Sequence, residues 1–561
     1  MTVLGGILTV YFAFLVVLFV TGGYVPGPEH RERSAVVEMW RMGPWVLGFL
    51  ALVLIYRLAD RQERFHRVAF VRALGAAAAW LTARPRAVYL VSAVWSVLLF
   101  AVAKRQLDAF GYSPDLEVFD QALWNTAHGR FYRSSLEGDI NLLSQHFDPL
   151  NLVLAAFYAV HPSPLILLAA QAIMLALGAV PLYWLARDRF PGSILAPLFP
   201  ILYLLYLPIR EANRFGYHPG SLVPPLFFFA LYCMERSRWA AMLGFLGLAG
   251  LLKENMPIAG AVIGIYLLAT GRQRVLGVLM ALGFGLWFYA GFAWIIPAFK
   301  PPTGEYRYFD LFTKLRPTPS GVFLAPLLDP AAVAGGLVTH VERKLEYLLD
   351  VFGPLAFFSL LSPSRLFLAL PFLAPHLLSD LRFLTTVRTH HTADLTPFVF
   401  YSAMWGVSNA IRWGASAGWR GRRWSAETLT RAAAVALLSG SFLLHRWPEP
   451  FLFRRYAPTA HHERLRAALR EIPPEASVST QRQISLHLAH RRGLYRFPEL
   501  GPPGGEPADL VVLDRALLDR ETQVRAFEER VASLPNKGYE KVREDDTIMI
   551  FRRTPSGRPA P

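Results

Sequence analysis

Long apolar segments are the feature that most constrains what this chain can fold into. About thirteen of them reach or approach the roughly 20 residues that an α-helix needs to cross a bilayer. A helix satisfies its backbone hydrogen bonds within the segment, so helices are the expected spanning structure. We therefore predict an all-α polytopic membrane bundle. The segments run approximately over residues 3–21, 43–57, 88–104, 164–186, 194–209, 218–235, 239–252, 256–270, 275–297, 345–361, 365–379, 395–411 and 430–445.

The distribution of positive charge supports this interpretation. The formal net charge is +16, a value that also occurs in nucleic-acid-binding proteins. Here, however, the arginines cluster at the ends of apolar segments, as at Arg84 and Arg86, which is the bias that sets membrane topology. We therefore expect the lipid bilayer and not a nucleic acid as partner. The basic loops predict a multi-pass protein of the cytoplasmic membrane, with the N-terminus inside and the C-terminal part outside.

The apolar pattern divides the chain into three parts. Residues 1–87 are interpreted as an N-terminal transmembrane extension with a basic connector. Residues 88–446 are the transmembrane core, with a large outer loop at 105–163. Within that loop, residues 149–160 are apolar for only about a dozen positions, which predicts a juxtamembrane or re-entrant helix instead of a crossing. From 447 to 561 the composition predicts a small extracytoplasmic α/β domain with a disordered tail.

Short patterns in this last part predict its elements. We expect strands at 476–479, 509–513 and 547–551, and helices at 461–470 and 520–534. The segment has no glycine-rich phosphate loop. A role in packing or in gating a substrate is the expectation that remains.

An acidic cluster follows the apolar segment 88–104. Asp115, Glu117 and Asp120 fall within six positions, and carboxylates at a bilayer surface are costly to desolvate. One interpretation is the start of a helix, with Ser113 as N-cap and the acids favoured by the helix dipole. The other is a catalytic or metal-binding loop, in which a carboxylate deprotonates a hydroxyl group as general base.

Helical spacing places Glu117, Asp120, Gln121 and Trp124 on one face, at i, i+3, i+4 and i+7. Two neighbouring carboxylates would raise the pKa of one of them unless a cation intervened. The same spacing puts Asp115 on another face of the helix. All three acids are therefore candidates for the catalytic base.

Further polar residues gather in loops that the topology places on the same outer side. Arginine, lysine and histidine side chains there could hold a phosphate group. Lys253 and Glu254 could instead form a self-neutralising ion pair, and the histidines could bind a divalent metal ion. The candidate substrate-binding residues are Gln121, Arg133, His146, His218, Lys253, Glu254, His390 and His391.

The run from Asp115 to Arg130, DLEVFDQALWNTAHGR, resembles the hallmark of the DUF2079 family of predicted membrane proteins. The resemblance extends over roughly residues 90–410. The shorter matching motifs are Gln145–Pro149, Gly216–Pro219, Lys253–Asn255, Lys344–Leu349 and His390–Ala393.

That family is similar to the GT-C glycosyltransferase superfamily, whose members transfer sugars from polyprenyl-phosphate donors. The resemblance implies a multi-helix bundle with an acidic motif in the first large outer loop. It also implies that one of the acids is the catalytic base, with Asp115 and Asp120 favoured over Glu117.

The leading hypothesis is a membrane glycosyltransferase that moves a sugar from a lipid-linked donor to an extracytoplasmic acceptor. Two other classes stay open. One is a transporter or flippase for a lipid-linked or anionic substrate, which predicts charged residues at mid-membrane and broken helices in matched halves. The other is a non-catalytic membrane scaffold. The sequence leaves the sugar, the metal requirement and the oligomeric state unassigned.

Overall fold

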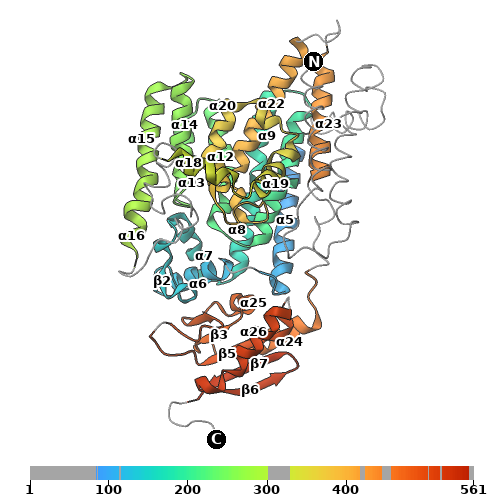
Figure 1. Cartoon of the computed structure of the whole chain (residues 1–561). Coiled ribbons are helices and arrows are strands. Elements are labelled where there is room, and N and C mark those ends of the chain that lie inside the picture. The colour runs from blue at the N-terminus through green and yellow to red at the C-terminus, as the bar shows by residue number, and fades with distance from the viewer. Residues whose placement is uncertain are drawn as a thin grey trace.

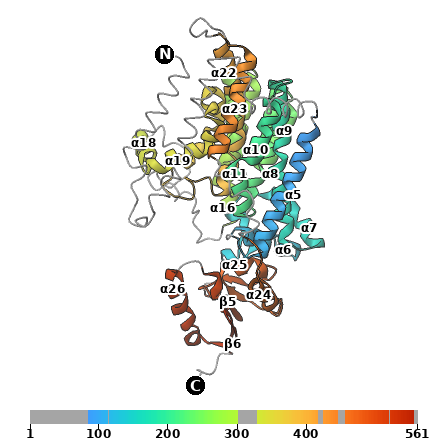
Figure 2. The same cartoon turned by 90° about the vertical axis from the view of Figure 1, so that its right-hand side faces the viewer.

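The computed structural model describes residues 84, 86–112, 115–300, 329–416, 424–444, 456–502, 504–518 and 521–554. The predicted spans at 3–21 and 43–57, the basic connector, the Ser113 cap and the tail after 554 lie outside these residues. Figure 1 shows a bundle of helices at the top and a smaller α/β unit at the bottom, with helices α6 and α7 between them. The view turned by 90° shows the same order of layers (Figure 2).

The bundle is built from apolar helices of unequal length. Within the described residues, four helical stretches are long and apolar enough to cross a membrane, at 86–108, 164–189, 195–215 and 274–298. The number of about thirteen crossings stays a prediction. The helices of the bundle are α5 (Arg86–Asp108), α8 (Pro164–Leu177), α9 (Ala179–Arg189), α10 (Leu195–Leu205), α11 (Leu207–Phe215), α12 (Pro224–Glu235), α13 (Trp239–Gly250), α14 (Pro257–Ala269), α15 (Arg274–Ala290), α16 (Ile296–Ala298), α18 (Pro330–Val338), α19 (Val341–Phe352), α20 (Pro363–Leu366), α21 (Leu370–Leu378), α22 (Thr396–Ser416) and α23 (Ala426–Leu444).

The predicted segment 345–361 is wrong as a continuous helix, whereas residues 363–378 are helical throughout, as α20, a 3-10 turn and α21. Helix α19 ends at Phe352, and short 3-10 turns separate it from α20 and α21. The cause is local backbone chemistry. Pro354 lacks the N–H that a helix interior needs, and Ala356 and Phe357 have positive φ values of 50° and 57°.

The outer loop forms a layer beneath the bundle. It contains α6 (Asp115–Ala127), the short hairpin β1 (Arg133–Ser134) and β2 (Ile140–Asn141), and the turn of 3-10 helix Pro149–Leu154 that leads into α7 (Ala155–Val160). Val153, Phe157 and Val160 on this last stretch are exposed. A short helix with an exposed apolar side fits the prediction of a surface or re-entrant helix at 149–160.

The C-terminal unit is a five-stranded mixed sheet with the order β4-β3-β5-β7-β6. Strand β3 runs parallel to β4 and β5, and β7 runs antiparallel to β5 and β6. The elements are α24 (Ala460–Arg470), β3 (Val478–Thr480), α25 (Arg482–Ser485), β4 (Leu494–Arg496), β5 (Leu510–Asp514), α26 (Glu521–Ala532), β6 (Tyr539–Asp545) and β7 (Ile548–Arg553).

The predicted strands at 476–479, 509–513 and 547–551 coincide with β3, β5 and β7, and the two predicted helices with α24 and α26. Strands β4 and β6 were not predicted. The first has only three residues. The second is an edge strand with charged, mostly exposed side chains, a composition that blunts sheet edges and hides the strand pattern.

Helices α14 and α15 pack closely through small residues. A Cβ atom on Gly277 of α15 would lie 2.7 Å from the carbonyl oxygen of Gly264 and 2.8 Å from the backbone nitrogen of Leu268, both on α14. Such close backbone approach requires glycine, as in other membrane helix pairs. By contrast, a Cβ atom on Gly283, also in α15, would meet no atom within 4 Å.

This contact generates a stability prediction. Gly277→Ala is expected to lower the free energy of unfolding by about 1–3 kcal/mol, because the new methyl group overpacks the contact between two backbones. Gly283→Ala is the matched control and should leave stability unchanged or slightly raised. Thermal unfolding of the full-length protein in detergent measures both. Equal melting temperatures for the two variants would contradict the close packing of α14 and α15.

Candidate functional site

Helix α6 forms as predicted, and its two faces meet different parts of the protein. On one side, the ring of Phe119 lies 5.8 Å from that of Tyr217 and 5.7 Å from that of His218, both in the loop before α12. On the other side, Glu117 and Asp120 contact the C-terminal unit. The predicted shared acidic face therefore exists, and it meets a folded part of the protein.

Glu117 is engaged in a buried ion pair. Its carboxylate is 1% exposed and accepts hydrogen bonds from Arg496 Nε at 2.8 Å and Ser485 Oγ at 2.5 Å. Arg496 also donates to Glu137 at 2.9 Å. Burial raises the pKa of Glu117 to about 7, although the charge of Arg496 and the bond from Ser485 act against it. Glu117 thus joins α6 to the C-terminal unit.

Asp120 is also buried and bound within the protein, but by different residues. It is fully buried, and Tyr158 Oη donates to its Oδ1 at 2.6 Å. His490 Nε2, from the C-terminal unit, lies 3.1 Å from Asp120 Oδ2. Burial lowers the pKa of His490, but the charge and hydrogen bond of Asp120 outweigh it and hold that pKa above its ordinary value. Each of the two acids therefore has its own basic partner from the C-terminal unit.

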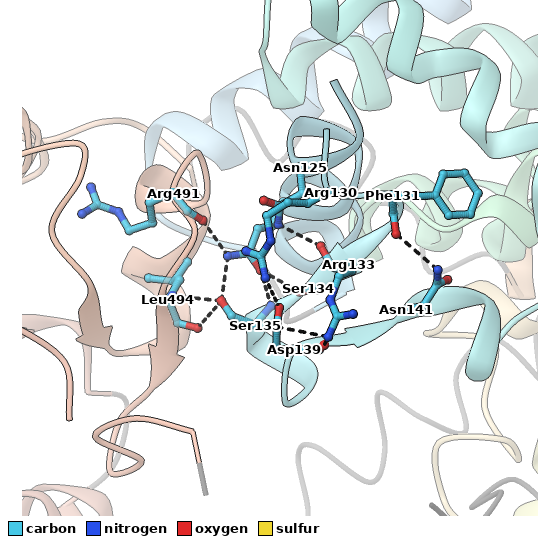
Figure 3. A network of polar contacts seen from close by, with 11 residues as sticks. Asn125, Arg130, Phe131, Arg133, Ser134, Ser135, Asp139, Asn141, Arg491 and Leu494 are labelled. Atoms are coloured by element: carbon cyan, nitrogen blue, oxygen red, sulfur yellow. Dashed lines mark hydrogen bonds and ion pairs between the residues drawn. The ribbon is translucent and has the colours of Figure 1, made fainter. Parts of the chain in front are cut away.

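The side chain of Gln121 also makes its hydrogen bonds to other protein groups. Its amide donates to Ser135 Oγ and to the Arg491 carbonyl, both at 2.9 Å, and accepts from Ser134 Oγ at 2.7 Å and Ser135 N at 3.0 Å. Ser135 in turn bonds the backbone of Leu494. Figure 3 shows this network between the β1 hairpin and the C-terminal unit. The predicted substrate contact of Gln121 is replaced by a positioning role.

Asp115 differs from the other two acids. It is half-buried, and its side chain makes no hydrogen bond or ion pair with the described residues. Burial raises its pKa, whereas the nearby charges of His146, Arg496 and Lys253 lower it and Glu137 raises it. Asp115 is therefore the acid of α6 whose carboxylate is available to react.

Four histidines from three loops come together near Asp115, and we call them the histidine cluster: His146, His218, His390 and His391. The rings of His218 and His390 stack with centroids 3.8 Å apart, and His390 lies 4.0 Å from His391. The His146 ring lies 5.7 Å from that of His218. The sequence placed these residues on one side of the membrane, and the structure brings them into contact.

Burial suppresses the positive charge of three rings in the histidine cluster. Burial lowers the pKa of His218, His390 and His391 well below the ordinary value, and the neighbouring rings and Lys253 add to the effect. These rings are therefore neutral near pH 7 and can donate one hydrogen bond each. Both ring nitrogens of His390 are buried without a hydrogen-bond partner among the described residues. Buried polar atoms of this kind are usually satisfied, so a ligand is one candidate partner.

Lys253 provides the positive charge beside this cluster. It is half-buried, in the turn between α13 and α14, and its charge acts on Asp115, the cluster histidines and Asp394. The alternative of a Lys253–Glu254 ion pair is wrong. Glu254 instead accepts from His146 Nδ1 and from Phe147 N, each at 3.1 Å, and Lys253 forms no ion pair with the described carboxylates.

Arg133 is not part of this group. It lies on the β1 hairpin, is largely exposed, and pairs with Asp139 at 3.2 Å (Figure 3). The described residues contain no group of three or more His, Cys, Asp or Glu side chains that could hold a metal ion. Stacked imidazole rings do not converge on one point as metal ligands must.

Sequence reasoning missed the C-terminal partners of α6. Arg496, His490 and Ser485 lie roughly 370 residues from the acids they contact. Tyr158, on α7, was also missed. Their signal in the sequence is weak, because a histidine or arginine in a soluble-looking α/β segment is usually solvated.

Comparisons with known proteins agree with a membrane protein. A family model described as "Predicted membrane protein (DUF2079)" matches residues 107–548. Among solved structures, ArnT from Cupriavidus metallidurans bound to undecaprenyl phosphate shares 12% identity, with 84% of this chain and 99% of that chain covered and a TM-score of 0.47. Its apo form shares 13% identity over 82% and 98% of the two chains, with a TM-score of 0.44. No curated protein matches this chain.

The buried ion pair on α6 generates a prediction. Arg496→Ala leaves Glu117 buried without its cation and should cost about 3–5 kcal/mol of stability. Arg553→Ala is the control, since its ion pair involves Glu506, which is 90% exposed, and such pairs contribute at most about 1 kcal/mol. Thermal unfolding and limited proteolysis of the full-length protein report the difference. Equal losses would show that the Glu117–Arg496 pair does not hold α6.

The His490–Asp120 contact predicts a pH dependence. Because the folded-state pKa of His490 is raised, its stabilising effect is complete below the ordinary histidine pKa of about 6.5 and is lost as the pH rises through the raised value. The melting temperature of wild type minus that of His490→Gln should therefore be largest near pH 6 and shrink at alkaline pH. His161→Gln, which changes an exposed histidine, should show no such trend. A difference that does not vary with pH would refute the charged contact.

Proposed function

This chain belongs to the DUF2079 family of predicted membrane proteins, and we propose that it is a membrane glycosyltransferase that uses Asp115 as general base. The donor is a sugar carried on a polyprenyl phosphate, and the acceptor is a hydroxyl group on the extracytoplasmic side. The protein lies in the cytoplasmic membrane, with helix α6 and the C-terminal unit on the extracytoplasmic side. The alternative functions, a transporter and a scaffold, gain no specific support.

One observation carries the proposal. Of the three acids on α6, Glu117 and Asp120 are engaged by the C-terminal unit, and Asp115 stays available beside a lysine and a histidine. A half-buried carboxylate whose pKa is raised by burial is a stronger base than a free one. An engaged carboxylate would first have to break its contacts.

The reaction follows from these positions. Asp115 takes the proton of the acceptor hydroxyl, and the oxygen attacks the anomeric carbon of the sugar. The bond from that carbon to the phosphate oxygen breaks, and the lipid phosphate leaves with the electron pair. Negative charge grows on this leaving group, and Lys253 is placed to stabilise it.

The histidine cluster complements that charge. A neutral imidazole donates one hydrogen bond to a phosphate oxygen, and the protonated one of the two unpartnered nitrogens of His390 provides such a donor. His146 is held by Glu254, which keeps that ring in place. We therefore assign Lys253, His218, His390 and His391 to the phosphate, and Glu254 to positioning. No step is assigned to a metal ion, because the described donors do not fit one.

Single substitutions on α6 test the proposal. Asp115→Asn removes the base but keeps the shape of the side chain, and should lower transfer by about 10²–10⁴-fold. The measurement is the formation of glycosylated product from lipid-linked sugars in membranes, with glycan profiling of cells that carry each variant. Asp139→Asn, on the exposed hairpin, is the control and should keep wild-type products.

Folding must be checked in the same samples. Asp115→Asn should melt near the wild-type temperature, because its carboxylate makes no hydrogen bond within the described residues. Asp120→Asn should melt lower, since it weakens the contact with His490. Unchanged products in a folded Asp115→Asn variant would overturn the assignment of the base. Unchanged products with altered movement of the lipid across the membrane would favour a transporter.

A further inference from the structure

A cavity lies on the C-terminal unit, and neither Asp115 nor Lys253 lines it. It has a volume of about 420 Å³ and lies between helix α24 and the segment 487–491. Arg466, Arg470 and Arg491 line it together with two histidines and several apolar side chains, and no carboxylate is among the lining residues. The cavity therefore has the charge of an anion site and a size typical of small-molecule sites.

Arg491 is a buried cation in the wall of this cavity. It is 5% exposed and donates to the carbonyl groups of Leu488 at 2.8 Å, Ala476 at 2.8 Å and Pro473 at 3.2 Å. It forms no ion pair within the described residues, and Figure 3 shows its guanidinium pointing away from the network around Ser135. Burial lowers its pKa to about 10, opposed only by the more distant charge of Glu475. An anion in the cavity would compensate this charge.

Two further arginines lie one helical turn apart on α24. Arg466 is half-buried and donates to the carbonyl of His462 at 3.3 Å, and Arg470 is exposed. Neither forms an ion pair with the described carboxylates. Arg464 on the same helix does, with Asp546 at 3.3 Å, and it does not line the cavity. The unpaired arginines of α24 are thus gathered on the side that faces the cavity.

The histidines connect the cavity to the rest of the protein. The ring of His487 packs 4.0 Å from that of Phe110, which directly follows α5, and its Nε2 is buried without a hydrogen-bond partner among the described residues. His490 contacts Asp120 of the acid helix. The cavity therefore lies next to the C-terminal end of α5, an apolar helix long enough to span a membrane. Its lining residue His490 also contacts α6 directly.

The geometry points to a phosphate-binding site in this cavity. Guanidinium groups match phosphate oxygens in shape and charge, and the lining supplies three of them, of which Arg491 is buried and forms no ion pair with the described residues. The apolar lining residues, Leu469 and Leu488 among them, suit the carbon part of a phosphate ester. The phosphate could belong to a soluble ester or to a lipid headgroup, since α5 ends beside the cavity. This assignment does not rest on the proposed transferase function.

Binding of inorganic pyrophosphate to the full-length protein tests the site. The protein is placed in nanodiscs of phosphatidylcholine, and heat of binding is measured for wild type, for the double variant Arg466→Gln/Arg470→Gln and for Arg464→Gln. Wild type and Arg464→Gln should bind equally. The double variant should bind at least about tenfold more weakly, as expected for the loss of charge-assisted hydrogen bonds. The comparison of the double variant with Arg464→Gln isolates this cavity from Lys253, which is unchanged in both variants.

A second arm identifies the source of the phosphate. In nanodiscs that contain phosphatidate, a lipid headgroup in the cavity would compete with pyrophosphate and protect segment 487–491 from hydrogen exchange. A soluble ester would leave pyrophosphate binding as in phosphatidylcholine. The proposal is overturned if wild type binds no pyrophosphate and gains no protection from phosphatidate. It is equally overturned if the folded double variant binds as well as Arg464→Gln.

Discussion

The buried ion pair between Glu117 and Arg496 is the interaction on which the arrangement of this protein depends. A buried carboxylate is destabilising unless a cation and further donors satisfy it, and here both come from the C-terminal unit. Helix α6 therefore keeps its position only when that unit is docked. Its opposite face packs through Phe119 against the loop that carries His218. The helical bundle, helix α6 and the C-terminal unit thus form one connected structure (Figure 1).

This docking gives the three acids of α6 different roles. Glu117 and Asp120 are similarly buried, and each has a basic partner from the C-terminal unit. Asp115 makes no hydrogen bond or ion pair with the described residues, and the charges of His146 and Lys253 act on it. Burial alone would raise the pKa of every acid on α6. The difference between Asp115 and the other two acids therefore arises from the positions of the residues that bind them.

Many elements of the fold could be predicted from local sequence pattern. Helix α6, the surface helix at 149–160, strands β3, β5 and β7 and helices α24 and α26 all follow from periodicity. The segment 345–361 was predicted wrongly as a continuous helix, because Pro354 and two positive-φ residues interrupt it. The site could be predicted in part. His146, His218 and His390 come together with Lys253 nearby, whereas Gln121 and Arg133 bind within the protein.

The sequence by itself determined which residues are apolar enough for a membrane and which acids stand at its edge, because both depend on the composition of neighbouring positions. Only the tertiary structure decided which acid stays available. The partners of Glu117 and Asp120 are separated from them by 379 and 370 positions. Periodicity reports contacts along one element and carries no information on such distant pairs. An ionisable group acquires its chemistry from the charges and solvent that surround it after folding.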